Sequence, residues 1–92
     1  MNKIIICLTA PLRRFAGGAD QVAVTAARVG DALQNLCAQY PALQGRILDD
    51  EGTPRDFINI FLGKKNIRAL GGADAPVAEG DVISIASPFS GG

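Results

Sequence analysis

One stretch of the sequence repeats its apolar side chains at helical spacing, and this restricts the chain to folds built around a single main helix. The apolar residues fall at i, i+3, i+4, i+7, i+8 and i+11, on one stripe: Val29, Ala32, Leu33, Leu36, Cys37 and Tyr40. Pro41 predicts where the helix ends. At its start, Arg28 stands where a capping Ser, Thr or Asp is expected, although Asp31 suits the dipole of the first turn.

The segments before this helix have the features of strands. Residues 3–8 are apolar and β-branched without alternation, which predicts a strand in the middle of a sheet or one covered on both faces. Residues 20–26 alternate polar and apolar side chains, as a strand with one wet face does. Gly17 and Gly18 lie between them and favour a turn, so the two segments are predicted to form an N-terminal hairpin.

The segments after the helix predict a polar loop and three more strands. Residues 44–56 are polar and contain glycine and proline, which indicates a surface loop with room for one short helical turn. Residues 57–62 and 66–70 are predicted to pair around a tight turn, and residues 82–86 to form the last strand. The resulting order, β-β-α-β-β-β, predicts an α+β fold in which one main helix packs on a mixed sheet of about five strands.

The composition argues against several kinds of function. The 92 residues carry nine basic and nine acidic side chains, so no net charge favours nucleic acid or membrane as a partner. The chain has no histidine, and Cys7 and Cys37 lie in apolar segments, which indicates buried side chains rather than metal ligands or a redox pair. We expect no metal site and no bound nucleotide. The apolar run at 3–8 is too short for a membrane span, and we expect a cytoplasmic protein.

Four strings of the sequence, taken in order, resemble the ubiquitin-like β-grasp sulfur carriers, the group that includes MoaD and ThiS. They are YPAL at the end of the helix, FINIFLGKKNIRAL, AEGDVISI and the final Gly91 and Gly92. Within that group, FINIF, NIR and EGD are most similar to the thiocarboxylate carriers of cysteine and secondary-metabolite biosynthesis. The tail departs from the family by carrying a bulky Phe89. The resemblance implies a β-grasp domain over residues 1–87 and a flexible tail over 88–92.

The resemblance also implies what the two final glycines do. An E1-like adenylating enzyme of the MoeB or ThiF type would use ATP to activate the carboxylate of Gly92, and a sulfur donor would convert it to a thiocarboxylate. A sulfur-accepting synthase would then take the sulfur. Because Gly91 and Gly92 lack Cβ, they can enter a channel only as wide as a backbone. The chain would then be a protein cosubstrate rather than an enzyme, with no cofactor of its own.

Two other functions are compatible with the same sequence. In a ubiquitin-like modifier, Gly92 would be joined to lysines of target proteins, again after adenylation. In a plain β-grasp interaction module, the glycine end would have no chemical role. Neither cysteine is expected to carry the transferred sulfur, since both lie in apolar segments.

Partner recognition is expected beside the tail. Pro88, Phe89 and Ser90 lie between the last strand and the glycines. We expect Phe89, with apolar residues of the 57–62 strand such as Ile58 and Ile60, to form an exposed patch that docks on the partner enzymes. The alternative is that Phe89 folds back onto the edge of its own sheet.

Overall fold

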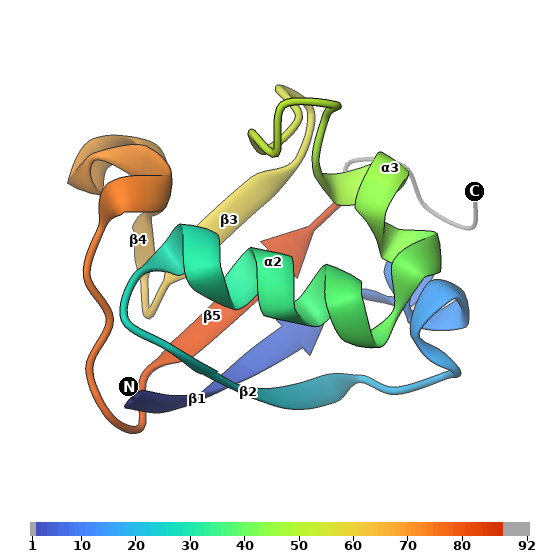
Figure 1. Cartoon of the computed structure of the whole chain (residues 1–92), viewed down its shortest axis with the longest axis horizontal. Helices are drawn as coiled ribbons and strands as arrows, with labels where there is room; N and C mark the ends of the chain where they lie inside the picture. The colour runs from blue at the N-terminus through green and yellow to red at the C-terminus, as the bar shows by residue number, and fades with distance from the viewer. Residues whose placement is uncertain (1, 88–92) are drawn as a thin grey trace.

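The computed structural model describes residues 2–87 and contains a five-stranded sheet packed against one main helix, α2 (Val29–Gln39) (Figure 1). The strand order is β2-β1-β5-β3-β4. The strands are β1 (Asn2–Leu8), β2 (Gln21–Ala26), β3 (Asn59–Leu62), β4 (Lys65–Asn66) and β5 (Val82–Ala86). This arrangement confirms the predicted α+β class and the predicted mixed sheet.

The two central strands, β1 and β5, run parallel, and the other pairs are antiparallel. Their register places Ile5 opposite Val82 and Leu8 opposite Ile85. Because parallel strands end at the same edge of a sheet, β1 and β5 both leave the sheet where Leu8 and Ala86 lie. The C-terminal end of the described chain is therefore fixed beside the start of the first connection.

Strand β1 lies in the middle of the sheet but is covered on one face only. Ile4, Ile6 and Leu8 are buried, whereas Ile5 and Cys7 are half-buried. Of the two alternatives for residues 3–8, the position in the middle of the sheet is correct and coverage of both faces is wrong. The apolar run lacked alternation because the open face of β1 also carries apolar side chains.

Helix α2 has the predicted stripe, with every member buried except the half-buried Tyr40. No side chain caps its first turn, as expected from the presence of Arg28 at the capping position. The backbone N–H of Val29 instead donates to the carbonyl of Ala75 at 2.9 Å, and the Arg28 guanidinium donates to the carbonyl of Asp74 at 3.1 Å. The segment that precedes β5 thus supplies a hydrogen-bond acceptor to the first turn of α2, which has no side-chain cap.

The first connection joins β1 and β2 as the predicted antiparallel hairpin, although it is longer than a tight turn. It contains α1 (Ala10–Arg13) and a 3₁₀ helix over Arg14–Ala16. Gly17 and Gly18 then adopt φ of 64° and 87°, in the left-handed region that glycine enters without steric cost. The predicted position of the turn is confirmed.

The segment after α2 was predicted to be a surface loop, and this is wrong for part of it. A 3₁₀ helix over Pro41–Leu43 leads into α3 (Gln44–Ile47), the short helical turn that the sequence allowed. Ile47 and Leu48 are buried and belong to the same hydrophobic core as the side chains of α2 and the sheet. Beyond them, the Asp49 carboxylate accepts hydrogen bonds from the backbone of Glu51 and Thr53, each at 2.9 Å.

The second hairpin is shorter than predicted. Only β3 and the two residues of β4 pair, and the segment Ile67–Leu70, which was predicted to continue the returning strand, is a 3₁₀ helix. The side chain of Asn66 accepts a hydrogen bond from the N–H of Arg68 at 2.9 Å and so caps that helix. Another 3₁₀ helix, over Gly72–Asp74, leads back toward α2.

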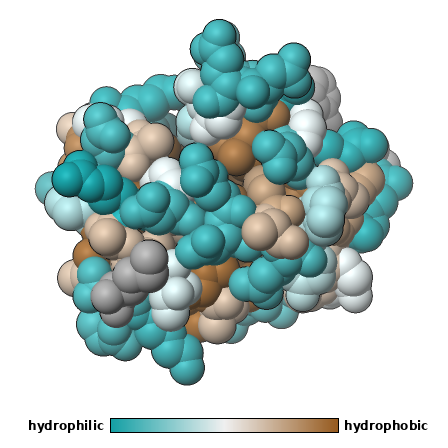
Figure 2. Space-filling model, viewed as in Figure 1, coloured by the Kyte–Doolittle hydropathy of each residue, from teal (hydrophilic) through white to brown (hydrophobic). Residues whose placement is uncertain are grey.

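The face of the molecule that carries α2 is mostly hydrophilic, with smaller apolar patches between polar side chains (Figure 2). Apolar side chains from α2, α3 and one face of the sheet form the core. No helix within residues 2–87 has the length and apolarity needed to cross a bilayer.

Candidate functional site

The predicted tail site, Pro88 to Gly92, lies outside the described residues, and the structure describes the point from which it starts. Ser87 follows β5 at the sheet edge where β1 also ends. Its backbone N–H donates to the Thr9 hydroxyl at 3.5 Å, and the N–H of Thr9 donates to the carbonyl of Ile85 at 3.3 Å. The tail therefore begins from a position that two adjacent strands fix.

The predicted exposed patch on residues 57–62 is wrong for the two residues chosen. Ile58 and Ile60 are only 3% and 2% exposed. Both belong to the hydrophobic core, and Ile60 pairs with the buried Ile85 across the β3–β5 ladder. The exposed apolar side chain in this region is Phe57, at 43%.

A groove lies beside the first residue of the tail. We call it the tail-root groove; its volume is ≈ 510 Å³ and its lining includes Leu12, Phe15, Arg46, Arg55, Phe57 and Ser87. The lining comes from α1, the adjoining 3₁₀ helix, α3 and the segment before β3. The fold thus gathers three separate segments of the sequence, residues 11–15, 45–46 and 55–58, around Ser87, where the tail begins.

The tail-root groove combines aromatic walls with cationic side chains. The Arg46 guanidinium lies 3.8 Å from the centroid of the Phe15 ring, and that of Arg14 lies 5.4 Å away. The Arg55 side chain donates to the carbonyl of Gly45 at 2.7 Å, which ties the segment before β3 to α3. The groove can therefore accept an apolar group while its rim favours negative charge.

A second surface lies on the face of the sheet that α2 does not cover. We call it the open face; it consists of Ile5, Cys7, Phe61, Val82 and Ser84. The strand register places Ser84 between Cys7 and Phe61, with Ile5 beside Val82. Val82 is 40% exposed and the other four are half-buried. The sequence reasoning missed this surface, which the alternation of β5 could have indicated.

The cysteines have the environments that their apolar neighbours suggested, with one difference. Cys37 is buried, and this burial raises the pKa of its thiol. Cys7 is only half-buried, because it belongs to the open face. Among the described residues, no group of histidine, cysteine and acidic side chains could hold a metal ion.

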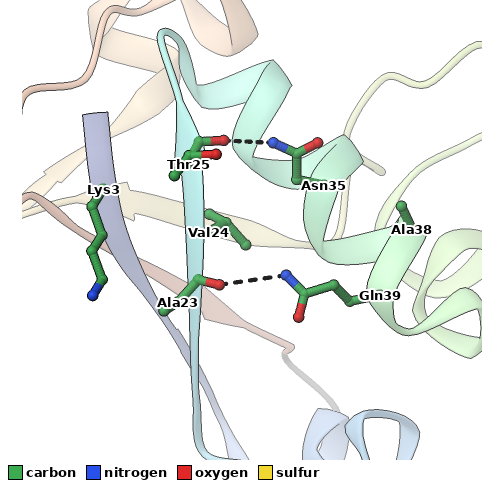
Figure 3. Close-up of a pocket in the computed structure, with 7 residues that line it drawn as sticks. All are labelled: Lys3, Ala23, Val24, Thr25, Asn35, Ala38 and Gln39. Carbon is green, nitrogen blue, oxygen red and sulfur yellow. Dashed lines mark hydrogen bonds between the residues drawn. The ribbon is translucent and has the colours of Figure 1, made fainter. Parts of the chain in front are cut away.

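A second hollow, besides the tail-root groove, lies between the edge strand β2 and α2 (Figure 3). The Asn35 amide donates to the carbonyl of Thr25 at 2.5 Å, and the Gln39 amide donates to that of Ala23 at 3.4 Å. These carbonyls point away from β1, along the unpaired edge of the sheet. Two side chains of α2 therefore occupy backbone carbonyls of the edge strand, with which another strand could otherwise form hydrogen bonds.

Comparison with known proteins identifies the fold and the family. The sequence profile of the ThiS family matches residues 6–92. Sulfur carrier protein CysO of Mycobacterium tuberculosis is 26% identical over 91 residues, which are 97% of this chain and 98% of that protein. The solution structure of small archaeal modifier protein 1 from Methanosarcina acetivorans is 34% identical, with a TM-score of 0.87 over 100% of this chain and 98% of that one.

A chain in the crystal structure of the Amycolatopsis orientalis BexX/CysO complex is also similar, with 25% identity and a TM-score of 0.87 over 97% of this chain and 99% of that chain. These likenesses confirm the predicted ubiquitin-like β-grasp fold. They also confirm the resemblance to sulfur carriers that the sequence suggested. The chain belongs to the ThiS family.

Proposed function

We propose that this chain is a sulfur carrier that acts through the carboxylate of Gly92. The observation that carries the proposal is the family match, which extends through residue 92 and so includes both final glycines. The Mycobacterium tuberculosis relative, which matches along nearly its whole length, is itself named a sulfur carrier. The body of the domain would serve as the handle, and the chemistry would take place at the tail.

The proposed reaction has two steps, both performed with a partner enzyme of the MoeB or ThiF type. The Gly92 carboxylate attacks the α-phosphate of ATP, and pyrophosphate leaves. Hydrosulfide then attacks the carbonyl carbon of the acyl-adenylate, the bond to AMP breaks, and a thiocarboxylate remains. If a protein persulfide is the donor, the product is an acyl disulfide, and a thiol must reduce it to release the thiocarboxylate.

The described part of the chain suits a protein cosubstrate. Strand β5 is hydrogen-bonded on both sides, to β1 and to β3, so the point where the tail begins is held firmly. The described cysteines are a buried Cys37 and a half-buried Cys7 on the open face. The carrier would therefore contribute its terminal carboxylate, while ATP is bound by the activating enzyme.

We further propose that the open face is the surface on which the activating enzyme and the sulfur-accepting synthase dock in turn. Ile5 and Val82 lie side by side on it, with Phe61 one strand further along, and they form an apolar surface that α2 leaves uncovered. Buried interfaces of this kind are centred on apolar and aromatic anchors. A related CysO chain was crystallised in a complex with BexX, which supports a carrier that works bound to other proteins.

The test is to incubate the full chain with a ThiF-type enzyme of the same organism, ATP and sulfide, and to weigh the intact product. We expect the mass increase that corresponds to one oxygen replaced by sulfur. The matched control lacks only Gly92 and should show no increase. If the shortened chain gains sulfur equally well, Gly92 is not the site.

The second candidate function is protein modification through Gly92. It is favoured by the 34% identity to a small archaeal modifier protein along the whole chain. Both functions use the same acyl-adenylate, and they differ in the nucleophile, a sulfur donor or a lysine amine. Conjugates of higher mass that disappear when Gly92 is deleted would support the modifier, whereas sulfur uptake alone would support the carrier.

A further inference from the structure

We propose that the tail-root groove is the resting site of the chain's own Phe89. The tail would then be anchored two residues after the sheet, and only Ser90, Gly91 and Gly92 would extend freely. This docking does not depend on the sulfur chemistry proposed above. It concerns where the tail lies when no partner is bound.

The groove and the tail are joined by connectivity. Ser87 is part of the groove lining, and Phe89 follows it after one residue. An extended chain advances at most ~3.6 Å per residue, so the Cα of Phe89 lies within about 7 Å of that of Ser87. Pro88 fixes its own φ and restricts the residue before it, which narrows the directions in which the chain can leave Ser87.

The walls of the groove suit a phenyl ring. Leu12 and Ile58 are buried apolar members of the lining, Phe57 is exposed, and the half-buried Phe15 carries the Arg46 guanidinium over its ring. Phe57 is 43% exposed, and with Val82 it is one of the two large apolar side chains that lie exposed within residues 2–87. Aromatic rings prefer offset or edge-to-face contacts, which the exposed Phe57 ring can provide to a second phenylalanine.

Connectivity also favours Phe89 over a side chain of another protein. A group tethered by a short linker has an effective concentration in the millimolar range at the site it can reach. A partner residue present at micromolar concentration would have to displace it. The groove therefore binds the chain's own Phe89 before a residue of another protein. An enzyme that draws Gly91 and Gly92 into a channel must either work with the short free segment or displace Phe89 from the groove.

Backbone relaxation of the ¹⁵N-labelled full chain tests the docking. For the amide of Phe89 we expect an order parameter near that of the strands, about 0.8, and for Gly91 and Gly92 values below about 0.6. Phe57→Ala removes one aromatic side chain from the groove lining. It should lower the order parameter of Phe89 to that of Gly91 and Gly92. Phe61→Ala is the matched control, because it removes a phenylalanine from the open face, and it should leave the Phe89 value unchanged.

A second measurement uses the tail itself. Phe89→Ala should shift the amide resonances of Gly45, Arg46 and Arg55, which line the groove, and leave those of Ile5 and Val82 in place. Because Phe57 is exposed and Phe89 follows the last strand in the sequence, we expect both variants to fold, and unchanged resonances across β1 and β5 would show it. An order parameter for Phe89 as low as that of Gly92 in the unmodified chain, or equal loss in Phe61→Ala, would overturn the proposal. Neither experiment measures sulfur uptake. If the chain fails to take up sulfur, the proposed function is wrong, but the docking of Phe89 is still decided by these two measurements.

Discussion

The Arg46 guanidinium lies 3.8 Å from the centroid of the Phe15 ring and joins α3 to the first connection. We predict that Arg46→Gln lowers the free energy of unfolding by ~0.5–1 kcal/mol, the usual size of a cation–π contact at an exposed site. Urea unfolding measures it. Lys64→Gln removes a charge from the exposed second hairpin turn and serves as the control, with an expected change near zero. Equal losses in both variants would mean that net charge, and not the ring contact, decides the effect.

The sequence was most informative where the signal is local. Helical spacing depends only on residues a few positions apart, so the α2 stripe and the end of the helix could be predicted from the sequence alone. The turns at Gly17 and Gly18 depend on φ values that glycine adopts without steric cost. The predicted strands at 3–8, 20–26 and 82–86 differ from the observed ones by no more than a residue at either end.

The predictions from the sequence were wrong where the burial of a side chain depends on residues that are distant in the sequence. The string FINIFL has apolar side chains on both faces of the strand, so it does not tell which face meets the helix. The pairing of Ile60 with Ile85 decides this and buries Ile60. Similarly, the side-chain cap from Asn66 and the burial of Ile67 turn residues 67–70 into a 3₁₀ helix instead of a strand.

The two faces of β3 should respond differently to truncation. Ile60 is 2% exposed, and Ile60→Ala should lower the free energy of unfolding by ~2–5 kcal/mol, because it leaves a cavity in the core. Phe61→Ala acts on the half-buried open face and should cost clearly less, although the ring is larger. Denaturant unfolding of both variants checks this order. A larger loss for Phe61 would mean that the open face is covered in solution.

Burial of Cys37 should make stability depend on pH in the alkaline range. Because burial raises the pKa of its thiol above the ordinary value of 9.0, the unfolded chain loses this proton first as pH rises. The unfolded state then binds fewer protons than the folded state, and the free energy of unfolding falls above pH 9.0. At lower pH the Cys37 thiol is protonated in both states, so its contribution to the free energy of unfolding does not change with pH.

The comparison that isolates this effect is the pH dependence of urea unfolding in the unmodified chain and in Cys37→Ala. The variant is less stable at neutral pH but should lose less stability between neutral pH and pH 10, the range around the ordinary thiol pKa. Parallel curves for the two proteins would show that the Cys37 thiol titrates alike in both states. Alkylation of the folded chain gives a second check, since half-buried Cys7 should react before Cys37.

Two helical glycines should respond in different ways to alanine. A Cβ added at Gly45 in α3 meets nothing within 4 Å, whereas one at Gly30 in α2 meets the Cβ and the carbonyl oxygen of Ala73 at 3.2 Å. Glycine in a helix costs ~0.5–1 kcal/mol relative to alanine. We therefore predict that Gly45→Ala raises the free energy of unfolding by about 0.5 kcal/mol and that Gly30→Ala gives no gain. Thermal unfolding of the two variants is the measurement, and a clear gain at Gly30 would show that Ala73 moves aside easily.

The amides of Asn35 and Gln39 should keep the β2 edge from pairing with another strand. In the double variant Asn35→Ala, Gln39→Ala, the carbonyls of Thr25 and Ala23 lose their donors and become open to the backbone N–H groups of a second chain. We predict that this variant self-associates at concentrations where the unmodified chain does not, as measured by sedimentation velocity over a dilution series. Gln34→Ala, which removes another exposed amide of α2, should sediment as the unmodified chain does. If the double variant also sediments like the unmodified chain and unfolds only ~1–3 kcal/mol more easily, the two amides act as ordinary hydrogen bonds and do not protect the edge.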